Sequence, residues 1–476
     1  MQDLLERLVD LGRERGCEYV EARFHEISSR SMTSRNGELV NVNVRLSRGV
    51  GVRVLVNGSL GFSATNDLTR EGLEKALESA ISRAKGLAKL YERPLSMGPA
   101  RVGRAKYEVA PKRGFDEVSP EEKLGLLRDL WNISASATRE AKVRALNVSY
   151  NESVERKVVV NSDGGFVESS IPRLYLFYNV VLGQPSAGYL QRAEEYGGSG
   201  GFELIRNWGL EEAIEREVKT LEGVLLTARA PPSEPVDVIV GSEIVGLMAH
   251  ESAGHPSEAD RVLGREMAQA GRSFIRPGMG GRRIGNELAT VVDDPTIPGS
   301  YGYFLFDDEA VAARPKYLYK EGIINEHLHN RATAKVFGVE SNGSARAMDY
   351  GSEPIVRMSN TYLTPGDRSF DELIEDIELG VYLKSYMEWN IDDERWNQRY
   401  VGLEAYLIER GELRGYVKNP VLEITTGAFY SGIVAKGKEL KFYAGTCGKG
   451  EPPQGVPVWF GGPDVRLEKV RLGVAQ

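Results

Sequence analysis

Two runs of alternating apolar and polar residues lie near the amino end of the chain. The first run contains Val40, Val42, Val44 and Leu46, and the second contains the valines between positions 50 and 56. A period of two is typical of a strand with one buried face. Asn36-Gly37 and Asn57-Gly58 favour two-residue hairpin turns, because such turns need positive φ at both central positions. The pattern therefore predicts antiparallel hairpins.

The segments before and after these predicted hairpins have apolar residues at helical spacing. Apolar residues recur every three or four positions from Leu4 to Leu11 and again from Leu73 to Ala84, as on the buried face of a helix. Residues 1–100 are therefore predicted to form a first α/β unit. A stretch rich in proline and glycine, Arg93 to Gly114, follows it and is predicted to be a linker.

The same order of elements returns in residues 114–229, which we interpret as a second α/β unit and a structural duplication. Ser119 caps a helix that has proline at its first position. Alternation from Leu146 to Tyr150 and from Leu174 to Val180 predicts strands, and a helix follows from Leu210 to Leu225. The Gly/Ser-rich stretch from Tyr196 to Gly201 is predicted to be a mobile loop.

Three prolines between Ala230 and Pro235 mark the clearest boundary in the chain, because proline cannot continue a helix. Val236 to Val240 is predicted to be a buried strand. The remaining residues are rich in strand patterns, and Phe370 to Tyr382 is predicted to be one of few long helices. The predicted fold class is α+β, with N-terminal helix–antiparallel-strand units followed by a large β-rich catalytic domain, residues 235–476.

Composition narrows the class of protein. A chain of 476 residues is too long for one ordinary domain, and 41% hydrophobic with 27% charged residues is typical of a globular protein. The formal charge of −8 disfavours a nucleic-acid partner. No apolar stretch has the length of a membrane span, and the first ten residues do not resemble a signal peptide. With two cysteines and no disulfide framework, we expect a cytoplasmic protein without a membrane partner.

Two of the five histidines lie in the segment His250-Glu251-Ser252-Ala253-Gly254-His255. A neutral imidazole is a good zinc ligand, and a carboxylate beside it can accept a proton from water. Five-residue spacing would turn the two rings about 140° apart on a regular helix. We therefore predict a π-bulge or a helix end between Glu251 and His255. The alternative is a pair of helix-end histidines, with Glu258 and Asp260 on a solvated acidic face.

Cys447 is the candidate for a third ligand, because a thiolate binds zinc strongly and this one lies in a glycine-rich turn. Two histidines and one cysteine leave a fourth position open for water, as in a catalytic zinc site. Glu251 would then be the catalytic base. The alternative for Cys447 is a small buried residue.

These motifs together resemble the TldD/PmbA family of modulator proteases. The resemblance rests on HESAGH at 250–255, the segment from Arg357 to Gly366, and Cys447-Gly-Lys followed by Val456-Pro-Val458. It implies a metallopeptidase that acts on unfolded or extended peptides. Zinc is the expected metal, and another divalent metal is the alternative. The resemblance also implies a TldD-type, metal-bearing subunit that forms a homodimer or a heterodimer with a metal-free sister subunit.

The segment after Arg357 contains three candidate substrate contacts: Arg357, Asn360 and Thr361. Structural contacts are the alternative for Arg357 and Asn360, and a buried arginine–carboxylate bond is the role expected of Arg357. Two segments depart from the family pattern, Glu451 to Gly455 and Trp389 to Tyr400. Both are interpreted as surface variation, with altered substrate preference as the alternative.

Two other functions remain open on the sequence alone. One is a metal-dependent amidohydrolase that acts on small substrates. The other is a non-enzymatic, metal-stabilised scaffold or regulatory subunit, which should fill all four zinc positions with protein ligands.

Overall fold

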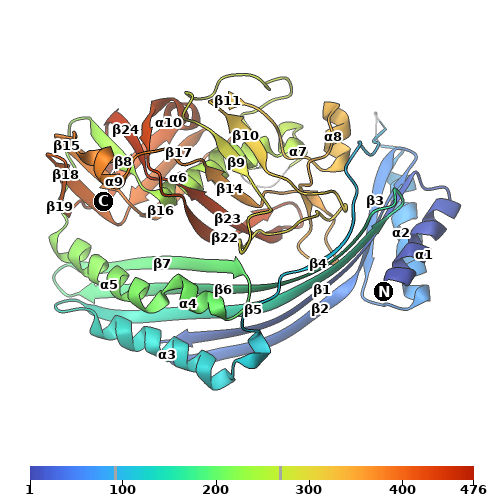
Figure 1. Ribbon diagram of the computed structural model, residues 1–476, viewed down its shortest axis with the longest axis horizontal. Helices are drawn as coiled ribbons and strands as arrows, with labels where there is room; N and C mark the ends of the chain where they lie inside the picture. The colour runs from blue at the N-terminus through green and yellow to red at the C-terminus, as the bar shows by residue number, and fades with distance from the viewer. Residues whose placement is uncertain (91–93, 267–270, 476) are drawn as a thin grey trace.

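The computed structural model describes residues 1–90, 94–266 and 271–475. A long curved sheet carries helices on its outer face, and a β-rich C-terminal body lies across its inner face (Figure 1). This arrangement confirms the predicted α+β fold class.

The N-terminal sheet has seven strands in the order β3-β2-β1-β5-β6-β4, with β7 paired to β6. All neighbours are antiparallel except β4 and β6. The strand bounds are β1 Tyr19–Arg35, β2 Glu38–Val56, β3 Ser59–Thr65, β4 Arg104–Glu108, β5 Lys142–Asn161, β6 Phe166–Gln184 and β7 Gly188–Ser199. The two alternating runs at 40–46 and 50–56 belong to one strand, β2.

Both predicted hairpin turns are present. Asn36 and Gly37 have φ values of 54° and 77°, and Asn57 and Gly58 have φ values of 52° and 69°. These positive angles are the ones that a two-residue turn between antiparallel strands requires. The turns join β1 to β2 and β2 to β3.

Helices cover the two ends of the sheet separately (Figure 1). Helices α1 Gln2–Glu14 and α2 Arg70–Leu87 pack on one end, and α3 Pro120–Ser136, α4 Glu203–Trp208 and α5 Leu210–Thr227 cover the other. The two predicted N-terminal units thus share one sheet, and their helices cover separate clusters of buried apolar side chains. The cluster under α1 and α2 also contains Val158, Val160 and Phe166 of the second unit. We propose that the chain is divided into the three predicted units, because the helices of the first two cover separate apolar clusters and the C-terminal body has a third.

Three predictions about local structure are corrected. Tyr196 to Ser199 ends strand β7 and is not a loop; its glycines permit close packing, since a Cβ at Gly197 would lie 2.9 Å from the ring of Tyr301. The helix predicted for Phe370 to Tyr382 ends at Ile374, because Leu379–Leu383 pairs as β15 between β8 and β18. The predicted linker contains strand β4, and Arg93 lies outside the described residues.

The C-terminal body contains two six-stranded sheets and two smaller ones. The first has the order β19-β18-β15-β8-β24-β21, with bounds Glu412–Tyr416, Ala405–Glu409, Leu379–Leu383, Val236–Val240, Val465–Val470 and Ile433–Lys436. The second has the order β11-β10-β9-β14-β23-β22, with bounds Ile323–Ile324, Lys316–Lys320, Val291–Asp293, Asn360–Leu363, Gln454–Gly462 and Lys441–Lys449.

The smaller sheets pair β12 Ala345–Arg346 with β13 Ile355–Val356, and join β16 Tyr386–Ile391, β17 Asn397–Gly402, β20 Pro420–Thr425 and β25 Gly473–Val474. The helices of the body are α6 Ser242–Ala249, α7 Ala259–Val262, α8 Arg331–Phe337, α9 Phe370–Ile374 and α10 Thr426–Gly432. None of the helices in the described part of the chain combines the length and the apolar character that a membrane span requires.

Helix α6 lies directly on the backbone of β23. A Cβ at Gly246 would lie 2.7 Å from the backbone nitrogen of Gly461 and 2.8 Å from its Cα. Real Cβ contacts are longer than this, so α6 reaches its position only because residue 246 has no side chain. Since α6 leads into the segment with both histidines, this contact sets the position of the candidate site.

We expect Gly246→Ala to destabilise the protein by about 1–3 kcal/mol, because the new methyl group would push α6 away from β23. Gly125→Ala in α3 is the matched control, since nothing lies within 4 Å of the position that a Cβ would take there. The control should be neutral or stabilising by up to about 1 kcal/mol. Urea unfolding of both variants measures the difference, and equal stabilities would contradict the packing argument.

Candidate metal centre

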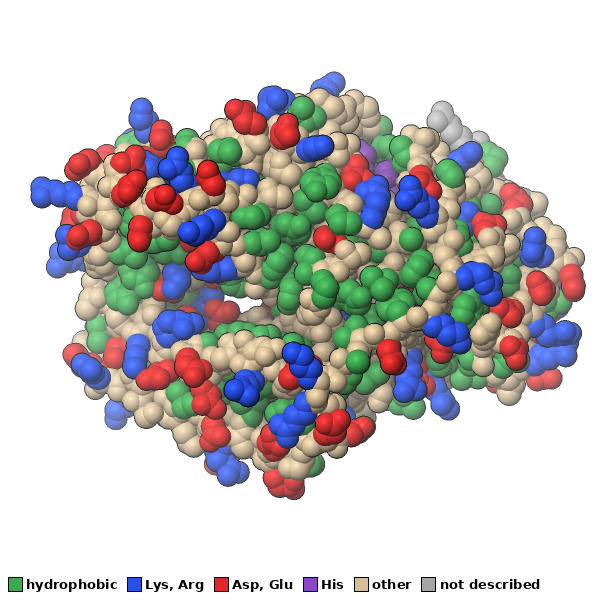
Figure 2. Space-filling view, in the orientation of Figure 1, with side chains coloured by type: hydrophobic (Ala, Val, Ile, Leu, Met, Phe, Trp, Pro, Cys, Tyr) green, Lys and Arg blue, Asp and Glu red, His purple; other side chains and the backbone are tan. Residues whose placement is uncertain are grey.

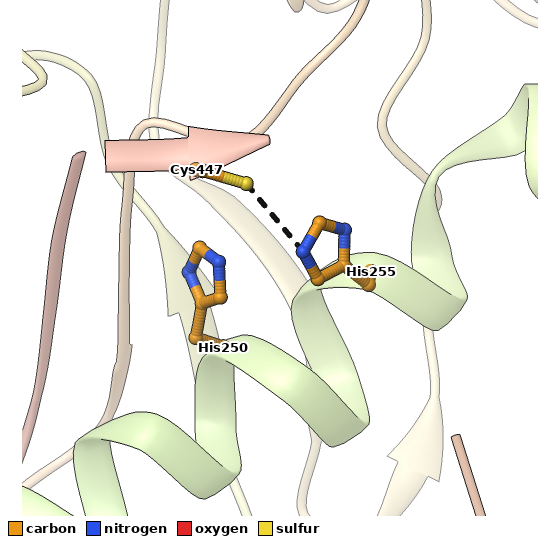
Figure 3. A group of neighbouring side chains, drawn as sticks. All are labelled: His250, His255 and Cys447. Atoms are coloured by element: carbon orange, nitrogen blue, oxygen red, sulfur yellow. Dashed lines mark hydrogen bonds between the residues drawn. The ribbon is translucent and has the colours of Figure 1, made fainter. Parts of the chain in front are cut away.

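The backbone leaves the regular helical path where the two histidines occur. Helix α6 continues as a π-helical turn, His250–Gly254, and then as a 3₁₀ turn, His255–Ser257. The predicted distortion is therefore confirmed. The wider turn brings both imidazoles to the same side of the chain (Figure 3), with ring centroids 4.9 Å apart.

Two small features of the sequence explain where the turn widens. A Cβ at Gly254 would overlap the sulfur of Met358, so only glycine allows this close approach. Pro256 follows at the second position of the 3₁₀ turn, where its missing N–H has no cost at the start of a helical segment. Glycine and proline thus permit the register change that five-residue spacing needs.

Cys447 reaches the two imidazoles from strand β22. Its Sγ lies 3.4 Å from Nε2 of His255, and one potential ligand atom from each of His250, His255 and Cys447 lies within 4.8 Å of the others (Figure 3). The three residues are 3–6% exposed. The structure therefore brings together three ligand-type side chains from segments almost two hundred positions apart in the sequence.

The surrounding charges favour a thiolate at Cys447. Burial alone would raise the pKa of this thiol, but the positive charges of His255, Arg357 and His250 hold it well below its usual value. For His255, burial is outweighed by Cys447 and Glu258, which raise the pKa of its imidazole. Burial lowers the pKa of His250. The thiolate of Cys447 and the neutral imidazole of His250 are the states in which these residues bind metals, whereas His255 would release a proton on binding.

Glu258 lies behind His255 and is completely buried. Its carboxylate is 2.9 Å from Nδ1 of His255, accepts a hydrogen bond of 2.6 Å from Nε of Arg261, and lies 3.4 Å from Nζ of Lys449. Burial opposes the charge, but Lys449, His255 and Arg261 hold the pKa of Glu258 well below its usual value. The alternative of a solvated acidic face is therefore wrong for Glu258, which orients the His255 ring with Nε2 toward Cys447.

Glu251 forms an ion pair with Arg395, and both side chains are buried. Arg395 lies between β16 and β17 with φ of 67°. Trp389, Ile391 and Arg395 line the cavity at the site. The interpretation of Trp389 to Tyr400 as surface variation is therefore wrong for these three residues, which line the same cavity as His250 and His255.

A cavity of about 480 Å³ opens in front of the three ligand-type residues. Residues of the N-terminal sheet form one wall and residues of the C-terminal body form the other. Figure 2 shows the molecule hollowed between these two parts. The lining includes Asn179, Gln191, Arg192, Glu194 and Glu195 from β6 and β7, Glu243 and Leu247 from α6, and Tyr443 to Gly448 from β22.

Arg357, Asn360 and Thr361 are fully buried and make contacts inside the protein. Arg357 donates to the carbonyl oxygens of Gln454 and Cys447, so the expected arginine–carboxylate bond is wrong. Asn360 donates to Asp294 O at 2.7 Å, and Thr361 donates to Asp293 Oδ1 at 3.1 Å. These contacts hold β14 and the cysteine strand in place, and the substrate contacts stay a prediction.

Sequence reasoning missed Arg395 and the role of Glu258. Glu258 follows His255 by three residues, the spacing at which side chains meet on a helical turn, so this signal was present. Arg395 reaches Glu251 from 144 positions away. No local pattern points to such a contact.

Comparison with known proteins gives matches along most of the chain. Family models described as PmbA/TldA metallopeptidase domain 1, central domain and C-terminal domain match residues 20–84, 113–221 and 233–474. A metalloprotease from Methanocaldococcus jannaschii is 33% identical over 97% of each chain. A protein of Saccharolobus solfataricus named zinc metalloprotease TldD homolog is 23% identical over 98% of this chain and 99% of its own.

A solved structure has the same fold. The crystal structure of TldE from Thermococcus kodakarensis matches with a TM-score of 0.77 and 19% identity, covering 99% of this chain and all of that one. Together with the three family models, the identity to the Methanocaldococcus protein shows that this chain belongs to the PmbA/TldA metallopeptidase family.

Proposed function

We propose that this protein is a metal-dependent peptidase that cleaves unfolded or extended peptides. In this proposal zinc is held by His250, His255 and Cys447, and Glu251 is the general base. The convergence of three buried ligand-type side chains beside a cavity, with Glu251 next to the first of them, carries the proposal. Membership of a metallopeptidase family and a relative named as a zinc metalloprotease support it.

The residues present fit a zinc ion. Two imidazoles and a thiolate are preferred zinc ligands, and three protein ligands leave a position for substrate or water. Nδ1 of His250 is buried and has no hydrogen-bond partner among the described residues, as expected for a nitrogen left available for another contact. A bound zinc ion would supply Lewis-acid polarisation of the scissile carbonyl and would acidify a water molecule.

The side chains of the protein then have separate roles. Glu251 accepts the proton of the attacking water and delivers it to the leaving amine nitrogen. Arg395 supplies the countercharge that a buried carboxylate needs. Glu258 fixes the ring of His255, and Arg357 holds the backbone of Cys447.

The strand that carries Cys447 favours an extended substrate. Strand β22 is the last strand of its sheet, and Tyr443 to Gly448 of this strand line the cavity. An extended peptide can add to such an edge through main-chain hydrogen bonds, which do not depend on the peptide sequence. The scissile bond would then lie beside the metal ligands.

The two rival functions have weaker support. A scaffold would use four protein ligands, whereas the described residues bring three together. An amidohydrolase acting on small molecules does not need a strand edge in its cavity. Hydrolysis rates for a series of dipeptides to decapeptides separate the two enzymes, since rates that are highest for dipeptides would favour the small-substrate enzyme.

We also propose that the protein works as a dimer, with itself or with a metal-free sister chain, and that it is cytoplasmic. The first proposal is supported by the family and by the structural match to TldE. The second is consistent with two buried cysteines that are both free.

Cys447→Ser is expected to reduce zinc content well below one ion per chain and to lower peptidase activity in parallel, because a neutral hydroxyl is a much weaker ligand than a thiolate. Cys17→Ser is the matched control, since Cys17 is also buried and free but packs in the core under α1 and α2. Its zinc content should be unchanged. Elemental analysis of both dialysed proteins measures this, and equal zinc contents would contradict the three-ligand site.

Glu251→Gln should retain the metal and lose activity by about 10²–10⁴-fold, because an amide cannot accept the proton of the attacking water. Elemental analysis and kcat/KM on one extended peptide check both statements. A variant that loses its metal would make Glu251 a ligand, and full activity would remove it from the reaction.

In the metal-free protein, the effects of substituting Arg395 and Glu251 on the free energy of unfolding should not be additive, because the two side chains form a buried ion pair. Arg395→Met leaves a buried carboxylate without its countercharge and should destabilise the fold by about 3–5 kcal/mol. The double variant with Glu251→Gln should recover part of this loss. Arg399→Met is the control on the same hairpin, where the side chain is 34% exposed and a change of less than about 1 kcal/mol is expected. Additive effects of Arg395→Met and Glu251→Gln would refute the coupling.

A further inference from the structure

Strand β22 has no side chain in the middle of the face that carries Cys447. Successive residues of a strand point to opposite faces, so Tyr443, Gly445 and Cys447 share one face. On the neighbouring strand β23, Phe460 lies opposite Tyr443 and Val458 lies opposite Gly445. Gly445 therefore leaves an opening in this face, about 7 Å along the strand from Cys447.

Neither the backbone nor the packing of the protein requires glycine at position 445. The φ angle of Gly445 is not positive. A Cβ there would lie 3.4 Å from a ring carbon of Phe460 and 4.0 Å from a methyl carbon of Val458, which are ordinary van der Waals distances. The missing Cβ atoms of Gly246 and Gly254, in contrast, make room for close contacts within the protein. The space beside Gly445 opens into the cavity, since Gly445, Val458 and Phe460 all line it.

The walls of this opening are apolar and firmly held. The 445 slot, as we call it, is formed by five residues of the cavity lining: Leu247, Tyr443, Gly445, Val458 and Phe460. The rings of Phe460 and Tyr443 are stacked with centroids 5.8 Å apart, and the Tyr443 hydroxyl lies 2.7 Å from Oγ of Ser242. The ring of Phe460 is also 6.4 Å from that of His250, between centroids. The slot is therefore a built feature directly beside a proposed metal ligand.

The slot favours an uncharged occupant. The charged residues of the nearby cavity wall bind one another, since Arg192 donates to Glu243 at 2.8 Å. The one polar group of the slot side chains, the Tyr443 hydroxyl, already has Ser242 as its partner. A charged side chain in the slot would lose its hydration without gaining a partner. An aromatic or large aliphatic side chain would instead bury apolar surface on both molecules.

We propose that the 445 slot is a specificity subsite, which binds an aromatic or large aliphatic side chain of the peptide substrate within two residues of the scissile bond. This inference rests on the proposed peptidase function and on addition of the substrate to the open edge of β22. Alternate side chains of an added strand point to the face that carries Cys447 and Gly445. The main chain of the peptide then supplies affinity that is independent of sequence, and the slot adds a preference for one side chain.

Peptide binding to the full-length, metal-free protein tests the subsite without catalysis. An octapeptide of alanine, serine and threonine with one central phenylalanine is compared with the same peptide carrying alanine or glutamate at that position. The phenylalanine peptide should bind about tenfold or more tightly than the other two, because only its ring buries apolar surface against Phe460 and Leu247. Isothermal titration calorimetry measures the three Kd values. Equal Kd values for the phenylalanine and alanine peptides would overturn the proposal.

Filling the slot should remove this preference. Gly445→Ala, Gly445→Val and Gly445→Leu place successively larger side chains against Phe460. The advantage of the phenylalanine peptide should fall in this order, to less than about twofold in Gly445→Leu, while the Kd of the alanine peptide changes by less than about threefold. Binding of the alanine peptide also shows that each variant is folded.

Gly415→Leu is the matched control. Gly415 lies on β19, which is also the last strand of its sheet, and nothing lies within 4 Å of the position that a Cβ would take there. This variant should keep the full preference for the phenylalanine peptide. An unchanged preference in Gly445→Leu, or equal weakening of both peptides by that substitution, would overturn the proposal.

Hydrolysis by the zinc-loaded protein separates this inference from the proposed function. When the phenylalanine is moved along the peptide, the cleaved bond should move with it at a fixed offset of at most two residues, as mass spectrometry of the products shows. Cleavage without a fixed offset would overturn the subsite and leave the peptidase function standing. Preferential binding of the phenylalanine peptide without any cleavage would support the slot as a binding site and contradict the peptidase function.

Discussion

The candidate metal centre depends on the buried carboxylate of Glu258. A completely buried charge is costly unless it is paired, and this one is surrounded by His255, Arg261 and Lys449. Lys449 lies two residues after Cys447, so one carboxylate is connected to both segments that supply ligand-type side chains. It therefore fixes the direction of one imidazole and, at the same time, the distance between the histidine turn and the cysteine strand.

Two close contacts made by glycines complete this arrangement. Gly246 lets α6 rest on β23, and Gly254 lets the widened turn rest on Met358. Arg357 then ties β22 through the carbonyl oxygen of Cys447. The site is thus held in place from three directions, by the glycine contacts, by one buried carboxylate and by one buried arginine. The cavity in front of it remains open for a substrate.

The parts of the site that are local in sequence could be predicted, and the parts that depend on tertiary packing could not. Five-residue spacing of His250 and His255 is incompatible with a regular helix, so simple geometry was enough to predict the widened turn. Cys447 was identifiable because ligand-type residues are rare in this chain. The ion pair between Glu251 and Arg395 joins positions 144 residues apart, and its formation depends on where the hairpin of β16 and β17 lies in the folded protein.

For the fold, too, features that are local in sequence could be predicted, and features that depend on tertiary packing could not. Asn-Gly turns and alternating valines were sufficient to place β2 and its hairpins. The glycines of Tyr196 to Gly201 were misread as a mobile loop, because composition does not distinguish a flexible glycine from one that lets two surfaces touch. The helix predicted for Phe370 to Tyr382 is wrong beyond Ile374, because β15 pairs with two neighbouring strands and this pairing determines the backbone conformation from Leu379 onward.

The widened turn at His250–Gly254 has a consequence for how such a site can arise. A π-helical turn is equivalent to one additional residue in an α-helix, inserted without changing the direction of the flanking segments. In evolutionary terms, insertion or deletion of a single codon separates this six-residue motif from the familiar five-residue motif with histidines four apart. The two motifs can therefore present the same pair of imidazoles, although a residue-by-residue alignment of their sequences would count them as unrelated.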